Sequence, residues 1–133
     1  MKNINFYRRL PITMDENDIE NEVIELFSNE QHYTNGVLLE CLLEISERQV
    51  LNYCLLNASI RKMLNREILA RWDEDSVDNT ETCISIIIQL GLQTAYEYML
   101  SKAENIMNIN VKNEILETYE EMGSSVEYMG ITL

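Results

Sequence analysis

The sequence predicts a soluble, all-α domain of five or six helices, and two observations favour this fold class. The 133 residues contain only four glycines and one proline, so few positions force a helix to end. Apolar residues make up 46% of the chain, which is enough for one hydrophobic core. We therefore expect a single compact helical bundle over residues 1–133. Residues 1–12 and 124–133 are expected to be extended, or to contain a short strand.

Capping signals and helical spacing divide the first half of the chain into four expected helices. The first and third begin at a capping box, Ser or Thr followed three residues later by Glu or Gln. The fourth begins at Asn57 or Ser59 and ends near Trp72, and no Pro or Gly prevents the third and fourth from forming one rod. The expected ranges of the first three helices are 14–28, 37–45 and 47–57.

The second half of the chain begins after an acidic loop at residues 73–79. A fifth helix is expected over about 80–107, in one piece or two. It is apolar on more than one side, so it should lie at the centre of the bundle. The β-branched run 86–88 also fits a buried strand. A last helix begins near Asn110 and ends before Gly123.

The charge balance restricts the partners that the protein can bind. There are 23 acidic and 10 basic residues, which give a formal charge of −13. This charge opposes binding to nucleic acid, whose phosphates need a cationic face, and it opposes docking on anionic membranes. It favours a protein partner with a basic surface, or it serves solubility alone.

Residues that carry chemistry are few. Cys41, Cys54 and Cys83 are an odd number without a C-x-x-C pair, which indicates a reduced, cytoplasmic chain with thiols in its core. His32 is the single histidine, so a His-rich metal site is excluded. The loop at 73–79 departs from the calcium-loop pattern and is expected to cap the following helix. We expect no cofactor and no metal.

Residues 45–72 resemble the middle and end of an F-box. The Leu-Pro-x-Glu opening of that family is absent, and Trp72 falls late, so the resemblance covers about a fifth of the chain. It implies an adaptor that docks onto a ubiquitin-ligase subunit through an apolar helical groove. The positions that carry the resemblance are Val50, Leu51, Cys54, Leu56, Ile60, Leu64, Leu69 and Trp72.

The charge and the missing catalytic motifs predict a non-catalytic, protein-binding module. Its acidic surface would engage a basic partner protein, and would inhibit that partner where it covers a functional cleft. The alternatives are the F-box-like adaptor and a small enzyme that uses carboxylates, which a groove holding carboxylates of perturbed pKa would favour. The bases between Arg48 and Arg71 are expected to pair with acids of the same domain. The candidate partner-binding residues are Asp15, Glu16, Asp18, Glu22, Asp73, Glu74, Asp75, Asp78 and Glu81.

Overall fold

Helices are the regular elements of residues 1–52 and 54–127, the part of the chain that the computed structural model describes. This part contains seven α-helices and no strand, so the all-α prediction is confirmed and the expected number of five or six helices was too low. Short 3-10 turns follow three of the helices, at Glu30–His32, Val50–Asn52 and Ala103–Asn105. The helices are α1 (Ile4–Arg8), α2 (Glu16–Ser28), α3 (Asn35–Gln49), α4 (Ala58–Arg71), α5 (Val77–Leu90), α6 (Gln93–Lys102) and α7 (Ile109–Met122).

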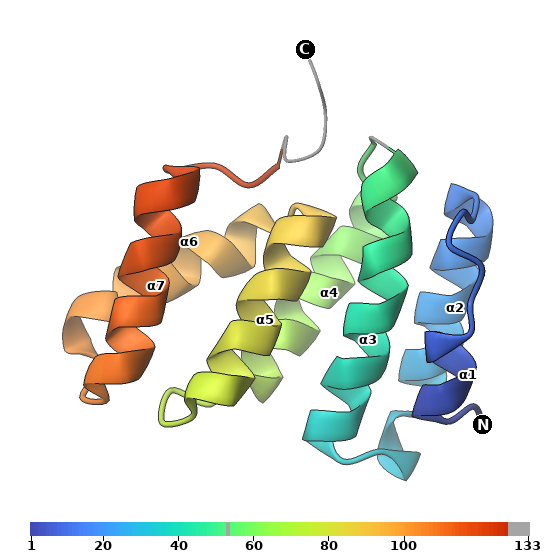
Figure 1. The fold of residues 1–133 in the computed structure, drawn as a ribbon, viewed down its shortest axis with the longest axis horizontal. Coiled ribbons are helices and arrows are strands. Elements are labelled where there is room, and N and C mark those ends of the chain that lie inside the picture. Colours follow the sequence, from blue (N-terminus) through green and yellow to red (C-terminus); the bar gives the residue numbers. More distant parts are fainter. Residues whose placement is uncertain (53, 128–133) are drawn as a thin grey trace.

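The helices form two layers (Figure 1). Helices α3, α5 and α7 lie side by side in one layer, and α2, α4 and α6 lie behind them. Helix α1 packs against α3 at one edge of the array. From α2 onward, successive helices alternate between the layers. The two layers of helices bury one core between them.

Helix α5 supplies the centre of the core. It packs on α3, α6 and α7, as its apolar residues on several sides predict. Cys83, Ile86 and Ile87 are fully buried, and burying each isoleucine contributes about 1.5–3 kcal/mol. The run 86–88 is helical, so the alternative of a buried strand is excluded.

Gly91 divides the long helix expected over 80–107 into α5 and α6. Its φ of 64° lies in the left-handed region, which glycine adopts without strain and which ends a helix. The backbone is also crowded there. A β-carbon at Gly91 would lie 2.7 Å from Cδ2 of Leu55 and 3.2 Å from the carbonyl oxygen of Glu127. The chain therefore turns at this residue into the second layer.

Two segments differ from the prediction. Ile4–Arg8 is a short helix rather than an extended segment, and the Asn3 side chain caps it. Helix α3 continues through Ser46, whose hydroxyl lies 2.8 Å from the Leu43 carbonyl and 2.6 Å from the side chain of Gln89. Because that hydroxyl is engaged elsewhere, it does not cap a new helix, and the helix predicted over 47–57 is absent. Residues 124–127 are not helical, and 128–133 lie outside the described residues.

Candidate functional site

The acidic residues of α2 contribute to the fold as well as to the surface. Asp15 is the N-cap, and its carboxylate accepts a hydrogen bond from the N–H of Asp18 at 2.9 Å. The predicted capping box therefore starts two residues too early. Glu22 lies 2.8 Å from the ammonium of Lys2 and is partly buried. Glu16 lies 3.8 Å from the thiol of Cys54. Asp15 and Glu22 thus stabilise the N-terminal region.

The acidic loop between α4 and α5 is held in shape by its own side chains. The Asp73 carboxylate accepts from the N–H of Asp75 at 2.9 Å, and Asn79 Oδ1 accepts from the N–H of Asp73 at 2.6 Å. Ser76 caps α5, so the predicted capping role of this loop is confirmed. The side chain of Asn108 donates to the Asp75 carbonyl at 3.1 Å, which fixes the loop beside the start of α7.

Carboxylates from α5 and α7 converge on one surface. The side chain of Glu81 lies within hydrogen-bond reach of Glu114, and Glu117 and Glu121 follow Glu114 at helical spacing. Burial, followed by these neighbouring carboxylates, raises the pKa of Glu114. A groove of about 330 Å³ lies at this surface, lined by Val77, Asn110, Asn113, Glu114 and Glu117. We call the following residues the acidic face: Asp78, Glu81, Glu114, Glu117 and Glu121.

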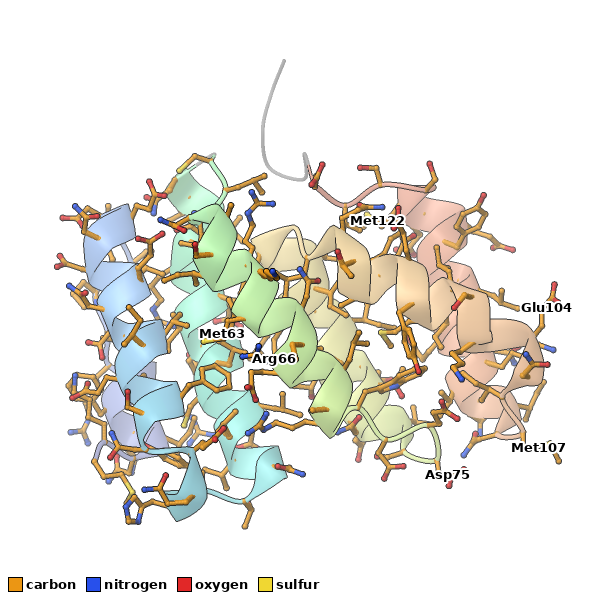
Figure 2. All side chains as sticks on the ribbon, turned by 180° about the vertical axis from the view of Figure 1, so that it is seen from behind. Met63, Arg66, Asp75, Glu104, Met107 and Met122 are labelled. Carbon is orange, nitrogen blue, oxygen red and sulfur yellow. The ribbon has the colours of Figure 1, made fainter. Side chains whose placement is uncertain are left out.

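The two acidic segments predicted from the sequence lie at opposite ends of α4. The N–H of Asn57, which caps α4, donates to a Glu20 carboxylate oxygen on α2 at 2.7 Å. The loop at 73–79 follows the other end of α4, and a helix of 14 residues is about 20 Å long. Figure 2 shows Asp75 on the side of the molecule away from α2. Of the two predicted segments, the one at residues 73–81 therefore contributes Asp78 and Glu81 to the acidic face, and the acids of α2 lie away from it.

Three residues of the acidic face were not among the predicted partner-binding residues: Glu114, Glu117 and Glu121. Their spacing on the last predicted helix was visible, because residues three and four apart share a helix face. What the sequence did not reveal is the packing of α7 on α5, which brings them to Glu81.

Four of the five bases between residues 48 and 71 form ion pairs with acids of the same domain, as predicted, and the pairs of Arg48 and Arg71 are the short ones. Arg48 is buried, donates to the carbonyls of Arg8 and Leu10 at 3.1 Å each, and pairs with Glu44 at 2.9 Å. Arg71 forms ion pairs with carboxylates on α4 and on the turn after α2. The three other bases line a groove between α4 and α6: Arg61, Lys62 and Arg66.

The apolar positions of the F-box-like segment do not share one buried face. Leu56 and Leu64 are buried, whereas Val50 and Leu51 are exposed by 37% and 46%. Cys54, which was expected in the core, is also exposed. The reason is that the helix predicted over these positions is replaced by a 3-10 turn, which points the two apolar side chains to solvent.

Comparison of the chain with known protein families, with curated proteins and with solved structures finds no match. In the described ranges no helix has the length and apolar character that crossing a bilayer requires. Within the same ranges, no group of three or more His, Cys, Asp or Glu side chains is arranged to hold a metal ion. The fold and the clustered carboxylates define an all-α protein of two helical layers with an acidic face on α5 and α7.

Proposed function

We propose that this protein is a non-catalytic binding module whose acidic face receives a basic segment of a partner protein. The observation that carries the proposal is the convergence of Glu81, Glu114 and Glu117: burial, followed by the neighbouring carboxylates, raises the pKa of Glu114. Neighbouring carboxylates repel one another. A lysine or arginine of a partner would relieve that repulsion, so the cluster favours a cationic ligand.

The acidic loop extends this surface. The hydrogen bond between Asn108 and Asp75 holds the loop beside the groove, and Asp78 is exposed one turn before Glu81 on α5. Exposed acids attract a basic partner over a distance of about 8 Å at physiological ionic strength. They would therefore raise the rate of association. If the basic segment forms part of the partner's functional cleft, binding would cover that cleft and inhibit the partner.

The raised pKa of Glu114 is also a property of catalytic carboxylates. The other side chains that line the groove are those of Val77, Asn110, Asn113 and Glu117. The aliphatic side chain and the two amides can orient a ligand, so Glu117 is the one acid–base group that this lining places beside Glu114. We take the like charge of the cluster, which a cation relieves, as support for binding over catalysis.

Exposed Val50 and Leu51 support a second candidate function, the F-box-like adaptor. Two adjacent apolar side chains at a turn after α3 offer a small hydrophobic contact for a partner. This contact differs from the acidic face in its response to salt, because a charge-driven complex weakens with ionic strength and a hydrophobic one does not.

Selection of random twelve-residue peptides displayed on phage tests the proposed function with a defined probe. We expect enrichment of peptides rich in Lys and Arg, and loss of their binding when Glu81, Glu114 and Glu117 are changed together to Gln. The matched control removes three charges elsewhere: Asp18→Asn, Glu40→Gln and Glu104→Gln.

An equal loss of binding in both triple variants would show that the net charge of the chain, and not the acidic face, determines peptide binding. This result would contradict the proposal. Enrichment of apolar peptides whose binding is lost with Leu51→Ala would instead support the adaptor. Far-UV circular dichroism and the melting temperature establish that each variant is folded.

A further inference from the structure

The groove between α4 and α6 has the opposite charge to the acidic face. It measures about 500 Å³, which is within the range of ligand pockets. The described residues that line it include three cations and no carboxylate, in a chain whose net charge is −13. Figure 2 shows Arg66 on α4 at the centre of this layer. The lining residues are Ala58, Arg61, Lys62, Asn65, Arg66, Leu69 and Thr94.

The cations of the groove differ in how far the chain already engages them. Arg61 donates to the Leu56 carbonyl at 3.0 Å and lies 3.7 Å from a carboxylate oxygen of Glu127. The Arg66 side chain is 73% exposed, and its ion pair with Glu67 is long, at 3.8 Å. Lys62 is exposed. Lys62 and Arg66 are therefore the cations that a ligand can reach.

A segment of this chain already shows how a peptide can approach the groove. Gln93 Nε2 donates to the carbonyl of Ser124 at 2.8 Å, and Gln93 Oε1 accepts from the N–H of Val126 at 2.8 Å. One side-chain amide thus holds the backbone of the non-helical residues after α7. That backbone brings the carboxylate of Glu127 to Arg61 at the rim of the groove.

We infer that the α4–α6 groove binds an extended, acidic peptide segment of a partner protein. Lys62 and Arg66 are one helical turn apart, about 6 Å along the axis of α4. Alternate side chains of an extended peptide are spaced by about 6.6 Å on one face. Two acidic residues separated by one residue therefore match the two cations, and an apolar side chain next to them meets Leu69.

The same geometry disfavours a single phosphate group. Its oxygens need donors that converge on one point, whereas these cations are distributed along a helix. The backbone N–H of Ala95 at the start of α6 is not available to an anion, because it donates to Asn65 Oδ1 at 2.8 Å. The groove also lies in the layer opposite to α5 and α7, so this inference is independent of the proposed function.

The peptide selection described above provides the test. We expect a second enriched class with two Asp or Glu residues separated by one position, against the overall repulsion of a chain at −13. A fluorescein-labelled peptide of this class should bind Lys62→Glu and Arg66→Glu about three- to tenfold more weakly than the unchanged protein. Arg9→Glu makes the same charge change at an exposed position on the N-terminal segment, and should bind as the unchanged protein does.

Four results would overturn the inference. The first is the absence of acidic peptides from the selection. The second is an equal loss of binding in Arg9→Glu. The third is displacement of the labelled peptide by inorganic phosphate at an equal concentration, which would make a phosphate compound the ligand. The fourth is peptide binding that occurs only in a chain ending at Glu127, which would make residues 128–133 the natural occupant. Melting curves of all three variants exclude loss of fold.

Discussion

Glu114 is the residue at which the electrostatics of the acidic face have a measurable consequence for stability. Burial and the carboxylates of Glu81 and Glu117 raise its pKa above the usual 4.5. The folded protein therefore holds a proton on Glu114 at a pH where the unfolded chain has lost it. Since the native state then binds more protons, the stability contributed by this group falls as pH rises from about 4.5 through the raised pKa.

We predict that Glu114→Gln stabilises the protein by about 0.2–0.5 kcal/mol at pH 7, the size of an exposed like-charge interaction on helices. The gain should disappear near pH 4, where the carboxyl of the unchanged protein is protonated and the repulsion is absent. Urea denaturation at the two pH values measures both free energies of unfolding. A gain of the same size at pH 4 would show that packing, rather than charge, is responsible.

The three thiols differ in exposure, which predicts their reactivity. Burial raises the pKa of Cys41 to about 11 and that of Cys83 to about 12. Partial burial and the Glu16 carboxylate also raise the pKa of Cys54, but of the three thiols it is the exposed one. A thiol reagent should therefore modify Cys54 in the folded protein, more slowly than a free cysteine, and the other two only after unfolding. Titration in denaturant without reductant should count three thiols. A count of one would reveal a disulfide and contradict the structure.

At the scale of the element, Gly91 is the residue that separates α5 from α6. Gly91→Ala should destabilise the protein by about 1–3 kcal/mol, because the left-handed φ strains any residue with a β-carbon and Leu55 lies in its way. Gly36→Ala is the matched control. Its β-carbon would meet nothing within 4 Å, and alanine favours a helix by up to about 1 kcal/mol. Equal melting temperatures for the two variants would contradict this account.

The faces of α5 are a second test at this scale. Ile87 is buried completely, whereas its neighbour Ile88 is only half-buried. We therefore expect Ile87→Ala to cost about 2–5 kcal/mol and Ile88→Ala less than half as much. Denaturant unfolding of the two variants measures the difference. Equal losses would mean that the α5 face is assigned wrongly.

Helix ends were predictable where the signal is local. Asn57 caps α4 and Gly123 ends α7, as expected, because a cap uses the residue's own side chain or φ. Ser46 begins a capping box in the sequence, and the prediction that it caps a new helix was wrong. Its hydroxyl reaches Gln89 on α5, a tertiary contact that no local pattern reveals. The N-terminal helix was missed because Ile4–Arg8 has only five residues, too few for its periodicity to be recognised.

At the scale of the whole molecule, the acidic character was predictable from composition, but the candidate site was not. Asp78 and Glu81 were identified because they stand near other acids in the sequence. The residues that complete the acidic face are on α7, more than thirty positions later, and join only through the packing of two helices. The acids of α2 were grouped with them by charge alone, and the fold separates the two sets by the length of α4.

This separation sharpens the prediction that concerns the acidic loop. Asp73→Asn, Asp75→Asn and Asp78→Asn together change the net charge from −13 to −10, two of them next to the acidic face and Asp78→Asn at its edge. Asparagine keeps a side-chain oxygen, so the bond from the N–H of Asp75 to residue 73 can persist and the loop should stay folded. The loop attracts a basic partner at long range but does not line the groove, so the triple change should act on association.

We expect the triple variant to bind a selected basic peptide with an association rate lowered about three- to tenfold at low salt and an unchanged dissociation rate. The difference should shrink as salt is raised past physiological strength, because screening removes the attraction in both proteins. Surface plasmon resonance over a salt series measures both rates. The F-box-like adaptor predicts the reverse. The triple change in the acidic loop would then leave both rates unchanged, and Leu51→Ala would raise the dissociation rate at every salt concentration. If the folded triple variant binds the peptide with an unchanged association rate at low salt, the acidic loop has no role in attracting the partner.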